Sequence, residues 1–510
     1  MKILFKYIFL PVLLVTFMTG CADFGDINNN PNLPTEPETK YLLLRSETMT
    51  DFFVFNAAYN PWTQLYPEYI SERKNVQHTK FAQLMLGTSS LYRNAIYPLD
   101  MIIAMNKGEE QATPKVLGLS SSNTNQIAAA TTLRAYFYMH LTDCLGDIVF
   151  SEADKGKSEG LFFPKFDSQK SIYETLDKEL NEVYGTFEEG KGLNANFDII
   201  YKGNISAWKK LNASLRMMLA IKLSDVDPAA GKARFAKAYA DGGIVEVEDC
   251  MIRPFLKEDD NSNLLYGNIK IDGRWDFAPS DKIINHMLQL NDPRLRAYAT
   301  PAQSDGTFRG WSFGGTQEQH AEYDIKDMSE FNPQFYQQDS PVTIISSAYI
   351  WSLISEAAYR GWISGDYKEF YNRAVKESFK FYGVAEGFSL ADVEEATRAK
   401  LSPNLDVEVY LAQEAVKLDG NDNDIKKIVL QRWIANFMQD GVQSWCDWRR
   451  FDYPDLKPGP VTPAMTVLPQ RLKYHTDDIN ANMQNYKDML KSQGPDEITT
   501  RVWWDVKANK

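Results

Sequence analysis

The sequence has few of the residues that metal and redox sites require. Its 510 residues include four cysteines and five histidines. Cys144, Cys250 and Cys446 lie far apart and form no CxxC pair, so we expect small buried side chains rather than a disulfide framework. No two histidines have the spacing of a zinc motif such as HExxH. We therefore predict no metal site and no cofactor.

Positive charge and long apolar runs are also scarce. Lys and Arg number 55 against 68 Asp and Glu, which gives a net charge of −13. Binding to nucleic acid needs clustered basic side chains, and an acidic surface does not adsorb to an anionic bilayer. Beyond the N-terminal segment, no apolar stretch is long enough to span a membrane. We therefore expect no nucleic-acid partner, and we expect any membrane attachment to come from the N-terminus.

The N-terminus has the pattern of a lipoprotein signal. Lys2 and Lys6 precede an apolar run that ends in Thr19-Gly20-Cys21. Residues 1–20 are predicted to be a signal peptide, cleaved after Gly20. The thiol of Cys21 would then carry a diacylglyceryl group and its new amine an acyl chain such as palmitate, and more than one chain anchors a protein stably. The alternative is a plain secreted protein in which a cysteine follows Gly20 by chance.

Beyond the anchor, helical periodicity dominates the chain. Residues 21–39 are rich in Asn, Asp, Pro and Thr and read as a flexible tether, and residues 40–510 as one domain. A stretch at about 251–346 lacks sustained periodicity and is rich in Gly, Pro and aromatics, which indicates a loop-rich insert. A second irregular region covers 451–469. The expected helices lie at 42–55, 127–141, 172–187, 208–223, 229–239, 282–290, 348–362, 370–381 and 425–438, with short strands at 244–247 and 269–271.

Short motifs in a fixed order resemble one known family. They are Asn30-Pro31-Asn32, Leu133-Arg134-Ala135-Tyr136 with Asp143 and Gly146-Asp147, Trp208 to Arg216, Asp292-Pro293-Arg294, Trp448-Arg449-Arg450, Leu468 to Tyr474, and Arg501 to Asp505. Together they resemble the SusD/RagB family of outer-membrane nutrient-binding lipoproteins. Phe451 departs from the family pattern, which usually has Thr after the paired arginines.

The resemblance implies a fold, a location and a partner. The fold would be all-α, with tetratricopeptide-like helix pairs supporting a more irregular half. The protein would sit at the cell surface, lipid-anchored in the outer membrane, beside a SusC-like TonB-dependent transporter. It would capture oligosaccharides or peptides without catalysis. Among the motif residues, we expect Arg134, Asp143, Asp147, Arg449 and Arg450 to pair with opposite charges and hold helices together rather than to contact ligand.

Two stretches have the composition of a sugar-binding surface. A sugar ring needs an aromatic platform with polar groups beside it. With 13% aromatic residues the chain offers many such platforms, and we expect the glycines around Trp311 to leave its ring exposed. The alternative for each aromatic residue is core packing. The candidates are Trp62, Tyr66 and Arg73 in the first stretch, and Trp275, Arg309, Trp311 and Phe313 in the second.

Two other functions remain open at this stage. A surface glycoside hydrolase needs two carboxylates that are near in space only, and 68 acidic residues allow many pairs. A helical-repeat scaffold that binds only proteins would also fit the composition. The leading hypothesis is nutrient capture for a transporter.

Overall fold

The computed structural model describes residues 38–55, 61–74, 76, 79, 81, 85–118, 123–383, 407–456 and 468–506. The predictions for the signal peptide, Cys21 and nearly all of the tether concern residues outside these ranges. Within them, no helix has both the length and the apolarity to cross a membrane.

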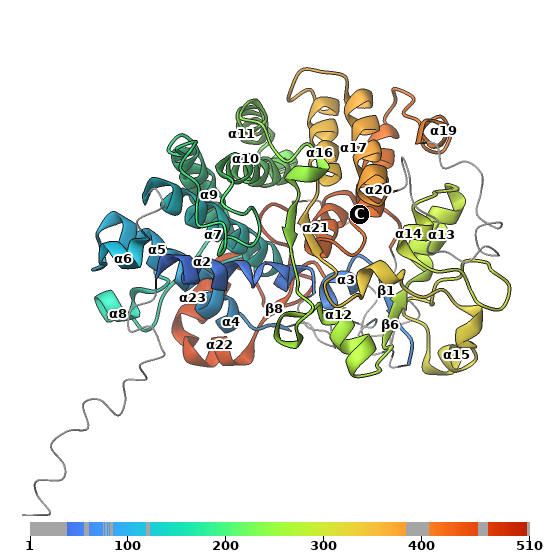
Figure 1. Cartoon of the computed structure of the whole chain (residues 1–510), viewed down its shortest axis with the longest axis horizontal. Helices are drawn as coiled ribbons and strands as arrows, with labels where there is room; N and C mark the ends of the chain where they lie inside the picture. The colour runs from blue at the N-terminus through green and yellow to red at the C-terminus, as the bar shows by residue number, and fades with distance from the viewer. Residues whose placement is uncertain are drawn as a thin grey trace, which may run out of the picture.

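Most of the described chain is helical, as the sequence predicts (Figure 1). Helices α5, α7, α9, α10 and α11 pack one against the next on one side of the molecule, and α10 joins them to α16, α17 and α20. These successive helix pairs form the scaffold. The longer helices are α2 (Thr39–Glu47), α5 (Tyr97–Lys107), α7 (Asn123–Leu145), α9 (Gln169–Tyr184), α10 (Ile205–Ile221), α11 (Pro228–Ala240), α13 (Asp281–Gln289), α16 (Ser347–Tyr359), α17 (Tyr367–Phe381), α20 (Asp424–Ala435), α21 (Gly441–Phe451) and α23 (Met483–Gln493).

Local sequence explains why these helices form where they do. In α9 the Ser168 side chain accepts a hydrogen bond from the Ser171 backbone, which caps the first turn. Ile172, Leu176 and Leu180, spaced four apart, are then buried on one face. Asn204 caps α10 and Ser346 caps α16 in the same way, by accepting from a backbone N–H three residues on. The scaffold therefore follows from capping residues and apolar stripes.

The predicted helices are confirmed, with ends that shift by a few residues. The helix expected at 42–55 is interrupted: α2 ends at Glu47, and a separate 3-10 turn, η2 (Thr50–Phe53), follows. The two predicted strands are wrong. Residues 244–246 are irregular and lead into η6 (Val247–Asp249), and 269–271 belong to the π-helical turn η8 (Gly267–Ile271). Ile244 and Ile269 are buried in the core, so their apolar character reflects packing without a neighbouring strand.

The stretch at 251–346 is built of short helical segments and strands, and four of the eight strands that the structure describes lie in it or pair with it. Strand β1 (Ile70–Glu72) pairs antiparallel with β6 (Phe277–Pro279), and β5 (Met251–Arg253) with β7 (Val342–Ile345). Elsewhere β2 (Met85–Leu86) pairs with β8 (Lys473–Tyr474), and β3 (Ile148–Val149) with β4 (Phe166–Asp167). Short helical segments connect them: α3 (Trp62–Leu65), α4 (Ser89–Leu91), η4 (Tyr92–Ile96), α6 (Pro114–Leu117), α8 (Lys155–Glu159), η5 (Lys222–Ser224), η7 (Asp259–Asn261), α12 (Leu264–Tyr266), α14 (Leu295–Tyr298), α15 (Gln317–Ala321), η9 (Ile325–Asp327), η10 (Pro333–Phe335), α19 (Val407–Leu411) and α22 (Thr476–Ala481).

The charged motif residues join these elements, and among the described ion pairs Arg134, Asp143 and Arg450 do so through an opposite charge, as expected, whereas Asp147 and Arg449 bind backbone groups. Arg134 pairs with Asp100 and, at 2.8 Å, with Glu179, which ties α7 to α5 and α9. Asp143 pairs with Lys222, and its pKa is lowered: burial opposes this, but the Lys222 ammonium, the Tyr173 hydroxyl and the Arg449 guanidinium together outweigh burial. The remaining three also bind within the fold. Asp147 accepts from the Gln169 backbone at 2.9 Å, Arg449 donates to the carbonyl of Asp143 at 2.8 Å, and Arg450 pairs with Glu356.

The three cysteines within the described residues are buried free thiols, which confirms their predicted role. Burial raises the pKa of Cys250 to about 11 and that of Cys446 to about 12, so the thiolate that redox chemistry needs is disfavoured.

Candidate ligand-binding site

The pairing of β1 with β6 brings the two predicted ligand-binding stretches together. In this pairing Ile70 lies opposite Pro279 and Glu72 opposite Phe277. The next residue, Arg73, donates its backbone N–H to the carbonyl of Asp276 at 2.8 Å. On the other side of β6, Trp311 donates to the carbonyl of Pro279 at 3.0 Å. Segments separated by more than 200 residues therefore lie side by side.

At this junction Arg73 lies between two tryptophans. Its guanidinium carbon is 5.2 Å from the ring centre of Trp311 and 5.9 Å from that of Trp275, which is cation–π geometry. Its Nη1 is 3.2 Å from Oε2 of Glu330. Tyr336 meets Trp275 edge-on, with ring centres 5.5 Å apart. We call Arg73, Trp275, Trp311, Glu330, Tyr336 and Lys270 the Arg73 cluster; Lys270 Nζ lies 5.0 Å from the ring centre of Tyr336.

Several polar groups inside the Arg73 cluster are buried without full compensation for the loss of water. Burial raises the pKa of Glu330 to about 7, although Arg73 acts to lower it. Arg73 Nε, Trp311 Nε1 and Glu330 Oε1 are buried and have no hydrogen-bond partner in the described part of the chain. Buried polar atoms normally have partners, and fold stability alone does not favour such an arrangement. These unpartnered polar atoms beside a partly exposed aromatic ring make the cluster a candidate functional site.

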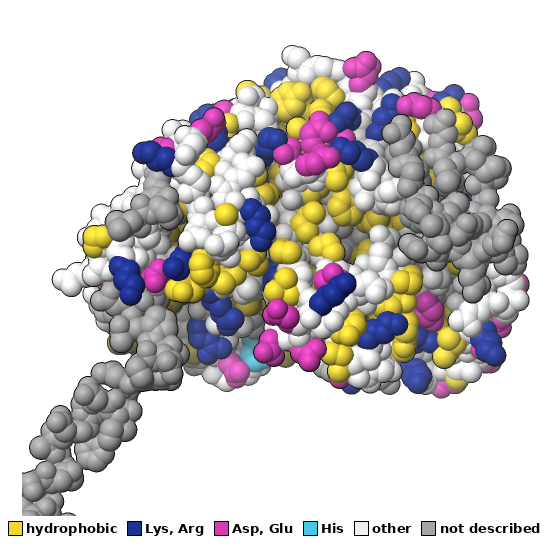
Figure 2. Space-filling model, in the orientation of Figure 1, with side chains coloured by type: hydrophobic (Ala, Val, Ile, Leu, Met, Phe, Trp, Pro, Cys, Tyr) yellow, Lys and Arg dark blue, Asp and Glu magenta, His cyan; other side chains and the backbone are white. Residues whose placement is uncertain are grey.

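The accessible part of the cluster is the face around Trp275. Its ring is half-buried, whereas Arg73 and Trp311 behind it are buried. Lys270 is exposed on one side, and on the other the Arg274 guanidinium pairs with Asp276 at 2.8 Å. A flat apolar ring with charged hydrogen-bonding groups beside it suits the C–H face and the hydroxyls of a sugar. In the view of Figure 2, hydrophobic side chains also gather in the hollow at the middle of the molecule, with charges of both signs around it.

The structure places the other predicted candidates differently. Trp62 and Tyr66 are buried and pack edge-on against Trp445, with ring centres 6.5 and 5.0 Å away. Phe313 is buried near Phe81. These three residues take the core-packing role that was the alternative for each. The remaining candidate, Arg309, is exposed, pairs with Asp305 and donates to the carbonyl of Asp327 at 2.8 Å.

The expected exposure of Trp311 is wrong, because its side chain is 2% exposed. The neighbouring glycine has another use. A Cβ at Gly310 would lie 2.2 Å from the carbonyl oxygen of Ser280, so glycine lets this segment approach the end of β6 closely. The approach buries the Trp311 ring against Tyr323 and His320. Its ring centre lies 5.6 Å from that of Tyr323 and 5.9 Å from that of His320.

Sequence reasoning missed Lys270, Glu330 and Tyr336. Glu330 lies 257 positions from Arg73, and no local pattern connects the two. Tyr336 could have been noted only as one more aromatic residue of the insert. Within the described residues, no group of three or more His, Cys, Asp or Glu side chains could hold a metal ion.

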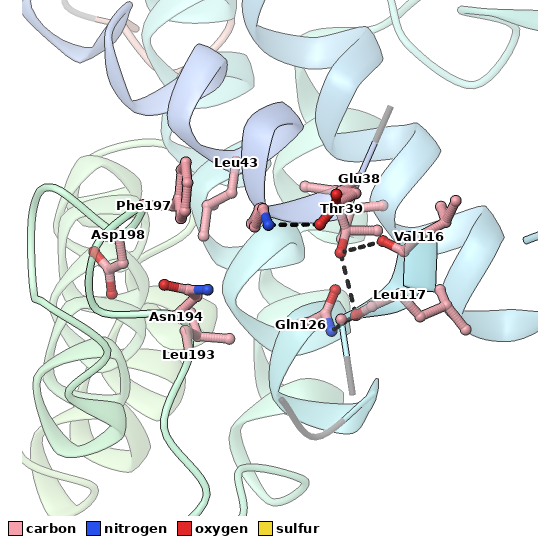
Figure 3. Close-up of a pocket in the computed structure, with 13 residues that line it drawn as sticks. Glu38, Thr39, Leu43, Val116, Leu117, Gln126, Leu193, Asn194, Phe197 and Asp198 are labelled. Atoms are coloured by element: carbon pink, nitrogen blue, oxygen red, sulfur yellow. Dashed lines mark hydrogen bonds and ion pairs between the residues drawn. The ribbon is translucent and has the colours of Figure 1, made fainter. Parts of the chain in front are cut away.

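A pocket near the start of the domain does not suit a nutrient (Figure 3). It lies between α2, α6 and the segment around Asn194, and its cavity of about 30 Å³ is too small for a sugar ring. The Thr39 hydroxyl donates to the carbonyls of Val116 and Leu117, and the Gln126 amide donates to Leu117. These bonds fasten the beginning of α2 to α6 and α7, which is a structural role.

Solved structures with the same fold are numerous. A chitin-binding protein has a TM-score of 0.76 and 22% identity, with 92% of this chain and 100% of that chain covered. A SusD homologue from Bacteroides fragilis has a TM-score of 0.75 and 24% identity, with 91% and 99% covered. A chitin-binding SusD homologue from Flavobacterium johnsoniae has a TM-score of 0.73 and 20% identity, with 92% and 98% covered. At these identities the likeness shows the fold.

A comparison with models of protein families also finds a SusD-like match, and this match covers most of the sequence. A SusD-like family model, described as starch-binding and associating with the outer membrane, matches residues 31–475. A comparison with curated proteins finds no match. The chain belongs to this SusD-like family, as its motifs predict, and shares its mostly helical fold.

Proposed function

We propose that this protein is a lipid-anchored receptor at the cell surface that binds an oligosaccharide without cleaving it. It then delivers the bound nutrient to a SusC-like TonB-dependent transporter in the outer membrane. Membership of an outer-membrane family described as starch-binding supports the location and the class of ligand. The signal sequence that ends at Cys21 supports the anchor.

The Arg73 cluster is the observation that carries the proposal. Trp275 supplies a half-exposed apolar ring, and Lys270, Arg274 and Asp276 supply donors and acceptors beside it. Arg73, held by Glu330 and by the β1–β6 pairing, stabilises the ring from behind. A platform held in place before ligand arrives loses little conformational freedom on binding. We favour oligosaccharide over peptide because a sugar ring stacks on one such platform and needs no apolar pocket.

One observation favours glycoside hydrolysis as a second candidate function. A hydrolase needs a general acid with a raised pKa, and burial raises that of Glu330 to about 7. We nevertheless favour simple binding, because Oε2 of Glu330 is held by Arg73 and the side chain is 17% exposed. Release of shorter products from an incubated oligosaccharide would overturn this preference.

Binding and product analysis together test the proposal. The soluble chain from Ala22 onward is titrated with starch and chitin fragments and with peptides by calorimetry, and the incubated ligands are analysed by mass spectrometry. We expect an intact oligosaccharide to bind and Trp275→Ala to weaken binding at least tenfold. Trp503→Ala, a partly buried tryptophan outside the cluster, is the matched control. Equal binding by Trp275→Ala and wild type would exclude this site, and binding of proteins alone would favour the scaffold function.

A further inference from the structure

A second cavity lies in the scaffold, away from the Arg73 cluster. We call it the Tyr92 pocket. It lies among α4, η4, the end of α7, the β3–β4 sheet and α22, and its volume is about 310 Å³, within the range of ligand sites. Helices α4 and α22 lie next to each other in Figure 1, at the lower left. The lining residues are Thr88, Ser89, Tyr92, Leu145, Ile148, Val149, Ala153, Asp154, Phe162, Pro164, Phe166, Tyr474, Asp478, Ala481 and Asn482.

Two adjacent phenylalanines stand exposed at this pocket. Phe162, which lines it, is 74% exposed, and Phe163 is 66% exposed. Burial of such a ring would be favourable, so a pair of exposed rings is costly on a soluble surface. Neighbouring exposed apolar side chains of this kind mark interaction surfaces.

The backbone that carries these phenylalanines is held in place. At the two ends of the β3–β4 connection, Ser151 N–H donates to Asp167 at 2.7 Å and Lys165 N–H donates to Glu152 at 2.8 Å. Two asparagines at the start of α23 bind its C-terminal part, where the phenylalanines lie. The Asn482 amide donates to the carbonyl of Pro164 at 2.5 Å, and the Asn485 amide to that of Phe163 at 2.8 Å. The rings are therefore presented by a fixed loop, and a partner that covers them need not order it.

The charge of the pocket has one sign. Among the described residues that line it there are two carboxylates, Asp154 and Asp478, and no Lys, Arg or His. Burial and the neighbouring Asp100 carboxylate raise the pKa of Asp154 to about 7, so we assign the attraction of a cation to Asp478. Oδ2 of Asp478 accepts from the Thr88 hydroxyl at 2.9 Å, which fixes the orientation of the carboxylate. A positive group at the rim would therefore be attracted, and a negative group repelled.

The floor of the pocket distinguishes a peptide from a sugar. Leu145, Ile148, Val149 and Ala153 make it apolar. Sugar hydroxyls buried against these side chains would lose their hydrogen bonds to water without replacement. An aliphatic or aromatic side chain has no such groups to desolvate, and a neighbouring Lys or Arg would reach Asp478.

We propose that the Tyr92 pocket docks a segment of a partner protein in which an apolar or aromatic side chain stands next to a Lys or Arg. The apolar side chain fills the pocket beside Phe162, the neighbouring Phe163 ring adds exposed apolar surface next to it, and the basic side chain pairs with Asp478. This surface is independent of the Arg73 cluster, so nutrient binding and docking can be tested separately.

Capped tripeptides provide the test. Saturation-transfer difference NMR on the soluble chain from Ala22 onward measures binding of acetyl-Lys-Phe-Lys-amide. We expect its aromatic protons to receive saturation, and its dissociation constant to rise at least fivefold in Asp478→Asn, which keeps an acceptor for Thr88. The double variant Phe162→Ala/Phe163→Ala should weaken binding tenfold. Leu256→Ala, another exposed apolar residue, is the control and should change nothing.

Several results would overturn the proposal. Absence of binding by the capped peptide, or equal binding in the two Tyr92-pocket variants, excludes the docking site. If acetyl-Glu-Phe-Glu-amide binds as tightly as acetyl-Lys-Phe-Lys-amide, then Asp478 does not select a basic side chain and the proposal fails. Binding that requires the uncapped peptide Lys-Phe-Lys would point to free peptide cargo instead of a protein segment. Displacement of the peptide by maltohexaose would make the pocket a second sugar site. Loss of oligosaccharide binding in Trp275→Ala affects none of these outcomes.

Discussion

Glu356 and Arg432 form a fully buried ion pair: Oε2 and Nη2 are 2.8 Å apart, and the two side chains are 0% and 1% exposed. The pair joins α16 to α20, and Arg450 of α21 binds the other oxygen of Glu356. Asp447 pairs with both arginines, at 2.9 and 3.0 Å. Three helices that meet at one buried network can adopt only one relative arrangement, which fixes the upper part of the scaffold.

Loss of the Glu356 charge should destabilise the fold strongly. In Glu356→Gln, two buried arginines lose their shared carboxylate, and removing one partner of a buried pair costs roughly 3–5 kcal/mol. Urea denaturation followed by circular dichroism should show this loss in the free energy of unfolding. Glu182→Gln, in an exposed pair with Lys178, should change it by less than about 0.5 kcal/mol. Equal effects of the two variants would contradict the structural role of the network.

The same network should contribute to acid sensitivity. Burial acts to raise the pKa of Glu356, but the Arg450 and Arg432 guanidiniums outweigh it and hold the pKa well below its ordinary value of 4.5. The stability from this group is therefore present above pH 4.5 and is lost as the pH falls below it. Denaturation between pH 5 and pH 3 should show a steeper loss of stability in wild type than in Glu356→Gln.

Arg134 should matter for stability and not for ligand binding. It is largely buried and pairs with Asp100 and Glu179. We expect Arg134→Ala to lower the melting temperature by several degrees, since an uncompensated carboxylate is left on either side. Calorimetry below the melting temperature should find the same oligosaccharide affinity as in wild type. An unchanged melting temperature with lost binding would place Arg134 in the ligand site instead.

The two tryptophans Trp275 and Trp62 should behave in opposite ways. Trp275→Ala removes a half-exposed ring, so oligosaccharide binding should weaken at least tenfold, about 1.4 kcal/mol, with little change in stability. Trp62→Ala removes a ring that is 5% exposed and should lower the free energy of unfolding by about 3–5 kcal/mol. Calorimetric titration and urea denaturation of both variants separate the two roles. The opposite pattern would return Trp62 to the ligand site.

Glu330 should make stability depend on pH near neutrality. Burial raises its pKa from 4.5 to about 7, so the folded state holds a proton that the unfolded state releases between these values. Its contribution to stability is complete below pH 4.5 and is lost as the pH rises through 7. Relative to Glu330→Gln, wild type should lose no more than about 3 kcal/mol between pH 5 and pH 8. A constant difference between the two proteins across this range would contradict the raised pKa.

Gly310 should be required for the burial of Trp311. In Gly310→Ala the new methyl group would meet the backbone of Ser280 and Asp281 at less than 2.5 Å, so this segment must move away from β6. We expect greater accessibility of Trp311 to acrylamide quenching and a lower melting temperature. Gly185→Ala is a control for the quenching, because no atom lies within 4 Å of its Cβ position and its φ is that of an ordinary L-residue. Unchanged quenching in Gly310→Ala would show that the contact is not needed.

The scaffold could be predicted because its signals are local. The Ile172, Leu176 and Leu180 stripe with its Ser168 cap lies within one segment, and a helix forms wherever such a segment can bury its apolar face. The motifs that contain Arg134 and Asp143 resemble family motifs, which predicted that these charges would be paired. Only the tertiary structure identified their partners. The strands expected at 244–247 and 269–271 failed because a short apolar run looks the same in a strand and in a buried turn.

The sequence predicted only part of the candidate site. Aromatic and polar residues singled out Arg73, Trp275 and Trp311, but not which of them meet or which ring faces solvent. By itself the sequence determined the acidic composition, the predicted lipid signal, the helical scaffold and the family, because each depends on residues close together or on motifs in order. Tertiary structure decided that Trp275 is accessible while Trp311 and Trp62 are buried, and that Glu330 pairs with Arg73. These relations join residues up to 257 positions apart through the β1–β6 pairing, and backbone hydrogen bonds between distant strands leave no periodic trace in either segment.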